Sequence, residues 1–388
     1  PNLLEMLFTI SAFVIIPLLF LNLKAGANIQ LYLYKKKIFS VFMNFNYLIL
    51  SYFDKNKRDL PWRDTKDAFR IWLSEIILQQ TRVDQGMKFY NNFIHEFETI
   101  FDLANADEQK VLKLWQGLGY YSRARNLHFT SQYIANELKG KFPDNFNDLK
   151  ELKGVGDYTA AAIASIVYNE AVPAVDGNMF RVFARYFNID DDISLPKTKK
   201  IFWDLGLEII DQKRPGDFNQ AVMDLGATVC TPKLAKCDSC PLNESCEALR
   251  LNKVNELPVK LKKVKVTNRH LHFIVIENED KIALSKRIGK DVWKNLYTFP
   301  KIETDTDLLD KGWIFEQNLE DKLSFISEEK HILSHQNLFI KYWKLNVSLK
   351  DINHFKQDLD FEMISLNDLE HYPLPKPIEK FINKHYLD

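Results

Sequence analysis

The sequence predicts a mainly α-helical region followed by a smaller α+β domain. Between about residues 45 and 229 the apolar residues follow helical spacing. Residues 270–276 and 339–347 instead alternate in the way that is typical of β-strands. The chain has 388 residues, enough for two or three domains, and its 46% apolar and 27% charged residues are globular usage.

Local signals place individual elements within this framework. Residues 107–115 carry an amphipathic pattern after an initial aspartate, and a proline opens a second helical stretch at 196–210. Glycine pairs at 117–119 and 154–156 predict tight turns between helices, because glycine adopts positive φ without strain. A proline and several lysines in residues 251–268 predict a linker.

The first residues allow three interpretations. Residues 7–23 form a mostly apolar run at the short limit of a membrane-spanning helix, and the chain begins at Pro1. Residues 1–42 are sequence upstream of a true start at Met43, or they contain a membrane anchor, or they form a buried or interfacial helix.

All four cysteines lie close together, in the pattern Cys230-x6-Cys237-x2-Cys240-x5-Cys246. Such clustering indicates a metal site in a reducing compartment, whereas the disulfides of a secreted protein would be spread along the chain. A zinc site usually adds a second CxxC pair or histidines, and four thiolates in one compact loop suit an iron–sulfur cluster. The spacing alone leaves zinc open.

Glu75 is the only charged residue between Arg70 and Arg82, in a stretch that is apolar on all sides. A helix here would be largely buried, and a carboxylate is rarely buried without a partner or a function. Burial raises the pKa of a carboxyl group, which suits a general acid near neutral pH. A salt bridge between packed helices is the alternative interpretation.

Two further motifs place polar residues at the start of predicted helices. Residues 152–159 read LKGVGDYT, which describes a helix–hairpin–helix whose N–H groups could hold a phosphate, or an ordinary turn between helices. Asp176 follows an apolar approach and precedes Gly177 and Asn178. A helix N-cap is the commonest role for such an aspartate, and a place on the floor of a cleft is the functional alternative.

Together these motifs resemble the helix–hairpin–helix DNA glycosylases, and specifically the MutY-type adenine DNA glycosylases. The resemblance covers residues 43–388 and rests on LPWR at 60–63, WLSEIILQQT at 72–81, GLGYYSR at 117–123, LKGVGDYTA at 152–160, VDGN at 175–178, and the cysteine loop. It implies an extension at 1–42, a two-lobed glycosylase domain at 43–229, an iron–sulfur cluster loop at 230–250, a linker at 251–268 and a Nudix-like domain at 269–388.

The resemblance implies an enzyme of base-excision repair. Adenine mispaired with 8-oxoguanine or guanine is flipped out of the duplex, and hydrolysis of its N-glycosidic bond leaves an abasic site. Glu75 would protonate N7 of adenine, Asp176 would stabilise the sugar cation, and Tyr158 and Asn178 would orient this pair. Lyases of the endonuclease III type carry lysine where Tyr158 stands, so we expect a monofunctional glycosylase. The four cysteines would hold a [4Fe-4S] cluster.

The family pattern also implies residues that contact DNA. Gln80 and Tyr120 would wedge into the base stack, and N–H groups of the hairpin at Gly154 and Gly156 would bind backbone phosphate. The zero net charge means that phosphate contacts must come from local basic clusters. The basic residues expected there are Arg63, Arg123, Arg125, Arg181, Arg185 and the lysines of residues 260–265.

In the C-terminal domain, Ser334 and His335 match the loop with which the family recognises 8-oxoguanine. Leu333 stands where the family usually has phenylalanine, which weakens the stacking part of this assignment, and a simple turn stabilised by the serine is the alternative. Residues 301–309 lack the REx2EE pattern of true Nudix hydrolases, so we expect no nucleotide hydrolysis.

These inferences predict a cytoplasmic, nucleoid-associated monomer that acts on double-stranded DNA, with membrane contact only if residues 7–23 are expressed. The alternative from another class is a non-catalytic DNA-damage-binding protein of the same fold. The presence of both Glu75 and Asp176 favours the enzyme.

Overall fold

The computed structural model describes residues 25–261, 265–309, 320–347, 352 and 359–387, so the apolar run at 7–23 lies outside it. The chain divides into two compact units that do not follow sequence order. Unit 1 contains residues 1–79 and 141–262, and unit 2 contains residues 80–140 and 263–388. Within the described ranges, no helix has the length and apolar content needed to cross a membrane.

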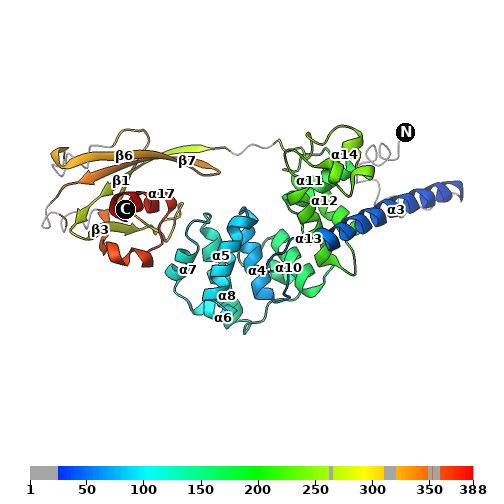
Figure 1. Ribbon diagram of the computed structural model, residues 1–388, viewed down its shortest axis with the longest axis horizontal. Coiled ribbons are helices and arrows are strands. Elements are labelled where there is room, and N and C mark those ends of the chain that lie inside the picture. Colours follow the sequence, from blue (N-terminus) through cyan, green and yellow to red (C-terminus); the bar gives the residue numbers. More distant parts are fainter. Residues whose placement is uncertain (1–24, 262–264, 310–319, 348–351, 353–358, 388) are drawn as a thin grey trace. The chain divides into compact units, whose positions relative to one another are not determined.

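Unit 1 is built of α-helices (Figure 1). They are α3 (Ala25–Asn56), α4 (Ala68–Leu78), α9 (Phe146–Lys150), α10 (Asp157–Tyr168), α11 (Gly177–Phe187), α12 (Pro196–Ile209), α13 (Pro215–Thr228) and α14 (Glu247–Arg250). Short 3-10 turns at Cys237–Ser239 and Asn243–Ser245 lie in the cysteine loop. The helix predicted at 196–210 is confirmed as α12, with its proline in the first turn.

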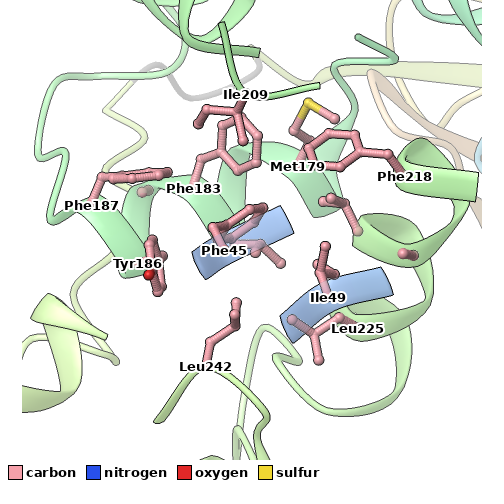
Figure 2. Packing of buried hydrophobic residues seen from close by; sticks show 14 of the residues in the cluster. Phe45, Ile49, Met179, Phe183, Tyr186, Phe187, Ile209, Phe218, Leu225 and Leu242 are labelled. Atoms are coloured by element: carbon pink, nitrogen blue, oxygen red, sulfur yellow. The ribbon is translucent and has the colours of Figure 1, made fainter. Parts of the chain in front are cut away.

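The core of unit 1 holds α11 in place. Figure 2 shows Phe45 and Ile49 of α3 among side chains of α11 and α13. The ring of Phe45 lies 4.9 Å from that of Tyr186 and 5.7 Å from that of Phe183, in the edge-to-face geometry that aromatic pairs favour. This packing fixes the helix that begins directly after Asp176.

The predicted helix–hairpin–helix is formed by α9, α10 and the turn between them. Gly154 has a φ of +85°, a left-handed value that favours glycine. Gly156 is the N-cap of α10 and makes no side-chain cap, and a Cβ atom added there would meet nothing within 4 Å. The backbone at the start of α10 is therefore open to close approach.

Unit 2 combines a helical part with the C-terminal α+β domain. Its α-helices are α5 (Val83–Glu96), α6 (Ile100–Asn105), α7 (Glu108–Leu114), α8 (Ser122–Asn136) and α17 (Lys376–Ile382). Its strands are β1 (Thr267–Val275), β2 (Glu277–Asn278), β3 (Lys281–Lys286), β4 (Tyr297–Thr298), β5 (Lys301–Thr304), β6 (Leu323–Ile332), β7 (Gln336–Leu345) and β8 (Glu362–Ser365). The helix predicted at 107–115 is confirmed as α7, with Asp107 as its N-cap.

The strands form two sheets. One has the order β5-β1-β7-β6, with β1 parallel to β7 and the other pairs antiparallel (Figure 1). The other joins β2, β3 and β4, and β8 also pairs with β3. The strands predicted at 270–276 and 339–347 are confirmed as β1 and β7.

Alternation along β1 ends in a fully buried stretch, because both faces of its sheet are covered. Phe273, Ile274 and Val275 are each 0% exposed. On one face the ring of Phe381 from α17 stacks on Tyr342 at 4.1 Å, and Ile274 packs into a separate apolar cluster with Phe361.

Hydrogen bonds join the C-terminal domain to α7 and to Gln116, just after this helix, within unit 2. Lys113 donates to the carbonyl oxygens of Leu369 and Tyr372 (3.1 Å each). Gln109 donates to the hydroxyl of Tyr297 (3.0 Å), and Gln116 donates to the carboxylate of Glu379 (2.9 Å). Residues 80–140 and the C-terminal domain therefore share one polar interface.

Candidate active site

Glu75 lies in the middle of α4 with 7% of its surface exposed. The hydroxyl of Tyr158, from the first turn of α10, donates to Glu75 Oε2 at 2.8 Å. Burial raises the pKa of Glu75 to about 7; the Tyr158 hydrogen bond and the charge of Arg63 lower it, and the charge of Asp176 raises it. Glu75 is thus a carboxyl group that can hold a proton at neutral pH, and its hydrogen-bond partner is a phenol rather than a cation.

Asp176 is the N-cap of α11 and also acts on Glu75 by its charge. Its Oδ1 accepts the backbone N–H groups of Asn178 (2.9 Å) and Met179 (2.8 Å), and its Oδ2 accepts Asn178 Nδ2 (2.6 Å). Burial raises the pKa of Asp176, and these hydrogen bonds oppose the rise. The structure confirms the N-cap interpretation and brings the same aspartate within electrostatic reach of Glu75.

Arg181 connects Asn178 to the cysteine loop. Its Nη2 donates to Asn178 Oδ1 at 2.7 Å, and its Nε donates to the carbonyl oxygen of Cys230 at 2.6 Å. The residue is 8% exposed. Arg181 was expected at DNA phosphate, but its guanidinium points into unit 1, where backbone and amide acceptors bind it.

The four cysteines line one cavity of about 30 Å³. Arg185 lies in the same lining, and its Nη1 donates to Cys230 Sγ at 3.3 Å and to the carbonyl of Thr231 at 2.8 Å. This arginine too is buried and does not present the phosphate contact expected of it. Burial raises the pKa of the Cys240 thiol to about 12. Among the residues that the structure describes, no three His, Cys, Asp or Glu side chains form a group that could hold a metal ion.

Arg63 forms an ion pair with a buried aspartate instead of a free basic surface. Its Nη1 and Nη2 donate to the carboxylate of Asp224 at 2.7 and 2.8 Å, and Arg58 Nε donates to the same carboxylate at 2.7 Å. Arg63 therefore does not make the expected phosphate contact. It is a cation inside unit 1, and its charge lowers the pKa of Glu75. Asp224 is 1% exposed and was missed in the sequence, although it is the only charged residue in the stretch 218–226. A lone charged residue in an uncharged stretch is the same signal that indicates Glu75.

Met223 was also missed. Its Sδ lies 3.1 Å from the hydroxyl oxygen of Tyr158, whose single proton is donated to Glu75. A methionine in a helical apolar pattern is ordinarily a core residue, so nothing in its sequence surroundings marked it.

In unit 2, two residues expected at DNA lie in left-handed backbone conformations. Gln80 has a φ of +56° and Tyr120 a φ of +47°. Tyr120 is 43% exposed, and its hydroxyl donates to Ser334 Oγ at 2.8 Å. Ser334 Oγ lies 3.2 Å from His335 Nδ1, at the tip of the β6–β7 hairpin. The fold therefore brings Tyr120, Ser334 and His335 together.

Arg123 supports the turns that carry Gln80 and Tyr120. Its Nη2 donates to Thr81 Oγ1 and to the carbonyl of Gly119, both at 3.3 Å, and its guanidinium lies 5.1 Å from the ring centre of Trp115. Burial lowers the pKa of Arg123 to about 10. It was expected at phosphate, and the structure places it beneath the surface as a support.

Comparisons with known proteins agree with both halves of this architecture. The model of the HhH-GPD superfamily base excision DNA repair proteins matches residues 73–206, and the NUDIX domain model matches residues 271–384. An adenine DNA glycosylase of Buchnera aphidicola is 34% identical over 345 residues, which cover 87% of this chain and 96% of that protein. The chain belongs to the adenine DNA glycosylase family.

Other relatives share parts of this glycosylase. The human adenine DNA glycosylase is 44% identical over 209 residues, which cover 52% of this chain and 38% of that protein. Among solved structures, a thermostable thymine-DNA glycosylase is similar with a TM-score of 0.50 and 27% identity, over 55% of this chain and 98% of that chain. The predicted helical glycosylase region and Nudix-like domain are confirmed, and this DNA glycosylase is an enzyme of base-excision repair.

Proposed function

We propose that this glycosylase removes adenine paired with 8-oxoguanine, or with guanine, from double-stranded DNA and leaves an abasic site. The observation that carries the proposal is the buried carboxyl group of Glu75, with a pKa of about 7, beside a phenol and under the influence of a second carboxyl group, Asp176. Two carboxyl groups in different environments form the arrangement that hydrolyses glycosidic bonds.

Glu75 acts as the general acid. Adenine is a poor leaving group, and a proton delivered from Glu75 to N7 allows the ring to take up the electron pair of the C1′–N9 bond as that bond breaks. The sugar is left as an oxocarbenium ion, which the ionised Asp176 stabilises by its charge or by a transient bond to C1′. Water then adds to C1′, loses a proton, and yields the abasic site.

Tyr158 and Asn178 hold the two carboxyl groups in place. Tyr158 donates to Glu75, and Asn178 donates to Asp176 from both its backbone and its side chain. Because position 158 is a tyrosine and not a lysine, it cannot form the Schiff base of a lyase, which supports a monofunctional glycosylase.

Base flipping is assigned to Gln80 and Tyr120. Both residues adopt left-handed backbone conformations, which are costly for side-chain-bearing residues and concentrate at functional sites. Backbone N–H groups at Gly154 and Gly156 are assigned to phosphate, because the start of α10 is open and has no side-chain cap. These contacts position the enzyme without reading sequence.

Ser334 and His335 are assigned to 8-oxoguanine. This base carries a hydrogen on N7, where guanine has a lone pair. Tyr120 donates its proton to Ser334 Oγ, and His335 Nδ1 lies 3.2 Å from the same oxygen, where the tautomer that carries its proton on Nε2 would accept the serine's own proton. Ser334 then offers a lone pair, which binds the N7–H of 8-oxoguanine and repels N7 of guanine.

The cysteines are assigned to a [4Fe-4S] cluster. Four thiols around one cavity suit a cluster, in which each cysteine binds a different iron, better than a zinc ion, on which the sulfurs converge at about 2.3 Å. When bound, the cluster would cross-link residues 230–246 next to α11. The domain boundaries at 230, 251 and 269, a monomeric state and association with the nucleoid complete the proposal, whereas position 43 lies inside the continuous helix α3.

A single-turnover assay tests the function. The duplex contains adenine opposite 8-oxoguanine or guanine, strand breaks are scored with and without alkali, and Glu75→Gln is compared with the wild type. We expect breaks only after alkali and only with the wild type. Equal inactivity of both proteins, with tight binding to the lesion, would instead support the non-catalytic damage-binding protein, and breaks without alkali would show a lyase.

A further inference from the structure

The hairpin tip that carries Ser334 and His335 is tied to the strands below it by Arg269 of β1. All five N–H donors of this guanidinium have acceptors. They are Nε to Glu303 Oε1 (2.7 Å), Nη2 to Glu303 Oε2 (2.9 Å) and Asp291 Oδ2 (2.8 Å), and Nη1 to Asp291 Oδ1 (2.6 Å) and Gln336 Oε1 (3.2 Å). Arg269 therefore has no donor left for a DNA phosphate.

Gln336 is the residue at the base of the hairpin turn. The main-chain carbonyl oxygen of Gln336 accepts a hydrogen bond from the N–H of Leu333 at 2.8 Å, which closes the turn around Ser334 and His335. The N–H of Thr267, two residues before Arg269 on β1, donates to the carbonyl oxygen of His335 at 3.1 Å. The start of β1 thus holds the turn at two points, one of them through Arg269.

The network around Arg269 is strong and fixed in orientation. Asp291 also accepts a hydrogen bond from Arg287 at 2.6 Å, so this carboxylate lies between two guanidinium groups. Burial would raise the pKa of Asp291, but hydrogen bonds from Arg269 and from the backbone lower it to about 2. Hydrogen bonds from Arg269 lower the pKa of Glu303 to about 2 as well. Forked contacts to carboxylates fix the plane of the guanidinium, which a lysine ammonium cannot do.

We propose that Arg269 is a positioning residue for the recognition of 8-oxoguanine: by holding Gln336 it fixes the turn from which Ser334 reads N7 of the base. The inference rests on the proposed function. Because 8-oxoguanine and guanine differ at N7 by one hydrogen bond, discrimination requires a serine hydroxyl held within about 0.5 Å of its productive place. A network with every donor satisfied supplies that support.

The test compares adenine excision from the two mispairs under single-turnover conditions. Arg269→Lys keeps the charge but loses the fork, and Gln336→Met removes only the acceptor on the hairpin. In both variants we expect the ratio of the rate with 8-oxoguanine to the rate with guanine to fall roughly tenfold. This is the size of effect expected when one charge-assisted hydrogen bond, from Arg269 to Gln336, is lost. Excision opposite guanine should stay within about twofold of the wild type.

Two matched variants sharpen the comparison. Gln336→Glu keeps an acceptor for Arg269 and is expected to retain the wild-type ratio. Lys344→Met removes an ion pair with Glu277 from the same strand, β7, and is also expected to retain it. Thermal unfolding of each variant is measured beside its rates, and if Arg269→Lys fails to fold, the Gln336 pair decides the result.

The outcomes separate this inference from the proposed function. A wild-type ratio in folded Arg269→Lys or Gln336→Met overturns the role of Arg269, and so does an equal loss on both mispairs, which would indicate a general structural role. If the wild type itself does not distinguish 8-oxoguanine from guanine, the proposed lesion recognition fails first, and the role of Arg269 falls with it.

Discussion

The hydroxyl of Tyr120 donates a 2.8 Å hydrogen bond to the hydroxyl of Ser334, a residue 214 positions further along the chain. One of these residues is assigned to the base stack and the other to the base opposite adenine. The contact lies within unit 2, so the two residues that we assign to unstacking and to lesion recognition belong to one compact unit.

A double-mutant cycle measures this contact. Tyr120→Phe and Ser334→Ala should each lower excision opposite 8-oxoguanine, and the double variant should lose less than the sum of the two, with a coupling of about 1 kcal/mol. Single-turnover rates on both mispairs give the cycle. Tyr133→Phe, at an exposed tyrosine within α8, is the control, and strictly additive effects would rule out the coupling.

The excision rate should depend on the protonation of Glu75. Because its pKa is raised to about 7, the acid form is present below that pH, and the single-turnover rate should fall roughly tenfold for each pH unit above it. Glu75→Gln should lose roughly 10²- to 10⁴-fold in rate together with this pH dependence. A wild-type rate that stays constant from pH 6 to 9 would contradict the assignment.

Removal of the Tyr158 hydroxyl should move this pH profile. The hydrogen bond from Tyr158 favours the ionised form of Glu75, so Tyr158→Phe raises the pKa of Glu75 further. The alkaline fall in rate is expected to shift to higher pH, while the maximal rate decreases as positioning is lost. Tyr168→Phe, in the last turn of the same helix, should leave the profile in place.

Gly226→Ala should disturb Asn178 and, through it, Asp176. A Cβ atom at Gly226 would lie 2.6 Å from Asn178 Cβ, so the asparagine has to move. We expect a decrease in excision of tenfold or more and a destabilisation of about 1–3 kcal/mol, seen in thermal unfolding. At Gly177 a Cβ atom meets nothing within 4 Å, so Gly177→Ala is the control and should unfold like the wild type. Wild-type excision by Gly226→Ala would remove Asn178 from the catalytic group.

Chemical analysis of the purified protein distinguishes an iron–sulfur cluster from a zinc ion at the four cysteines. The protein isolated without oxygen should contain iron and acid-labile sulfide in equal amounts. Removal of the metal should lower the melting temperature by roughly 5 °C or more, because residues 230–246 lose their cross-link next to α11. Zinc without sulfide would overturn the cluster, and Ser239→Ala, inside the loop but not a ligand, should keep its full iron content.

The residues of the candidate site could be predicted from the sequence because each carries a local signal. Glu75 is a lone charge in an apolar helix, Asp176 lies at a helix start, and the cysteines share a short loop. The sequence predicts phosphate contacts for the arginines because it shows a charge but not its partner. Arg63 pairs with an aspartate 161 positions away, and Arg181 with a carbonyl 49 positions away. Such partners are fixed only when the helices pack.

The polar interface between α7 and the C-terminal domain limits how this protein can be taken apart. Tyr297, Tyr372 and Glu379 find their hydrogen-bond partners on residues 109–116, far upstream of the linker. A fragment cut at the linker would expose these groups to water. A chimera that exchanges the C-terminal domain with that of a relative should therefore transfer the segment 108–116 together with it, so that these hydrogen bonds are kept.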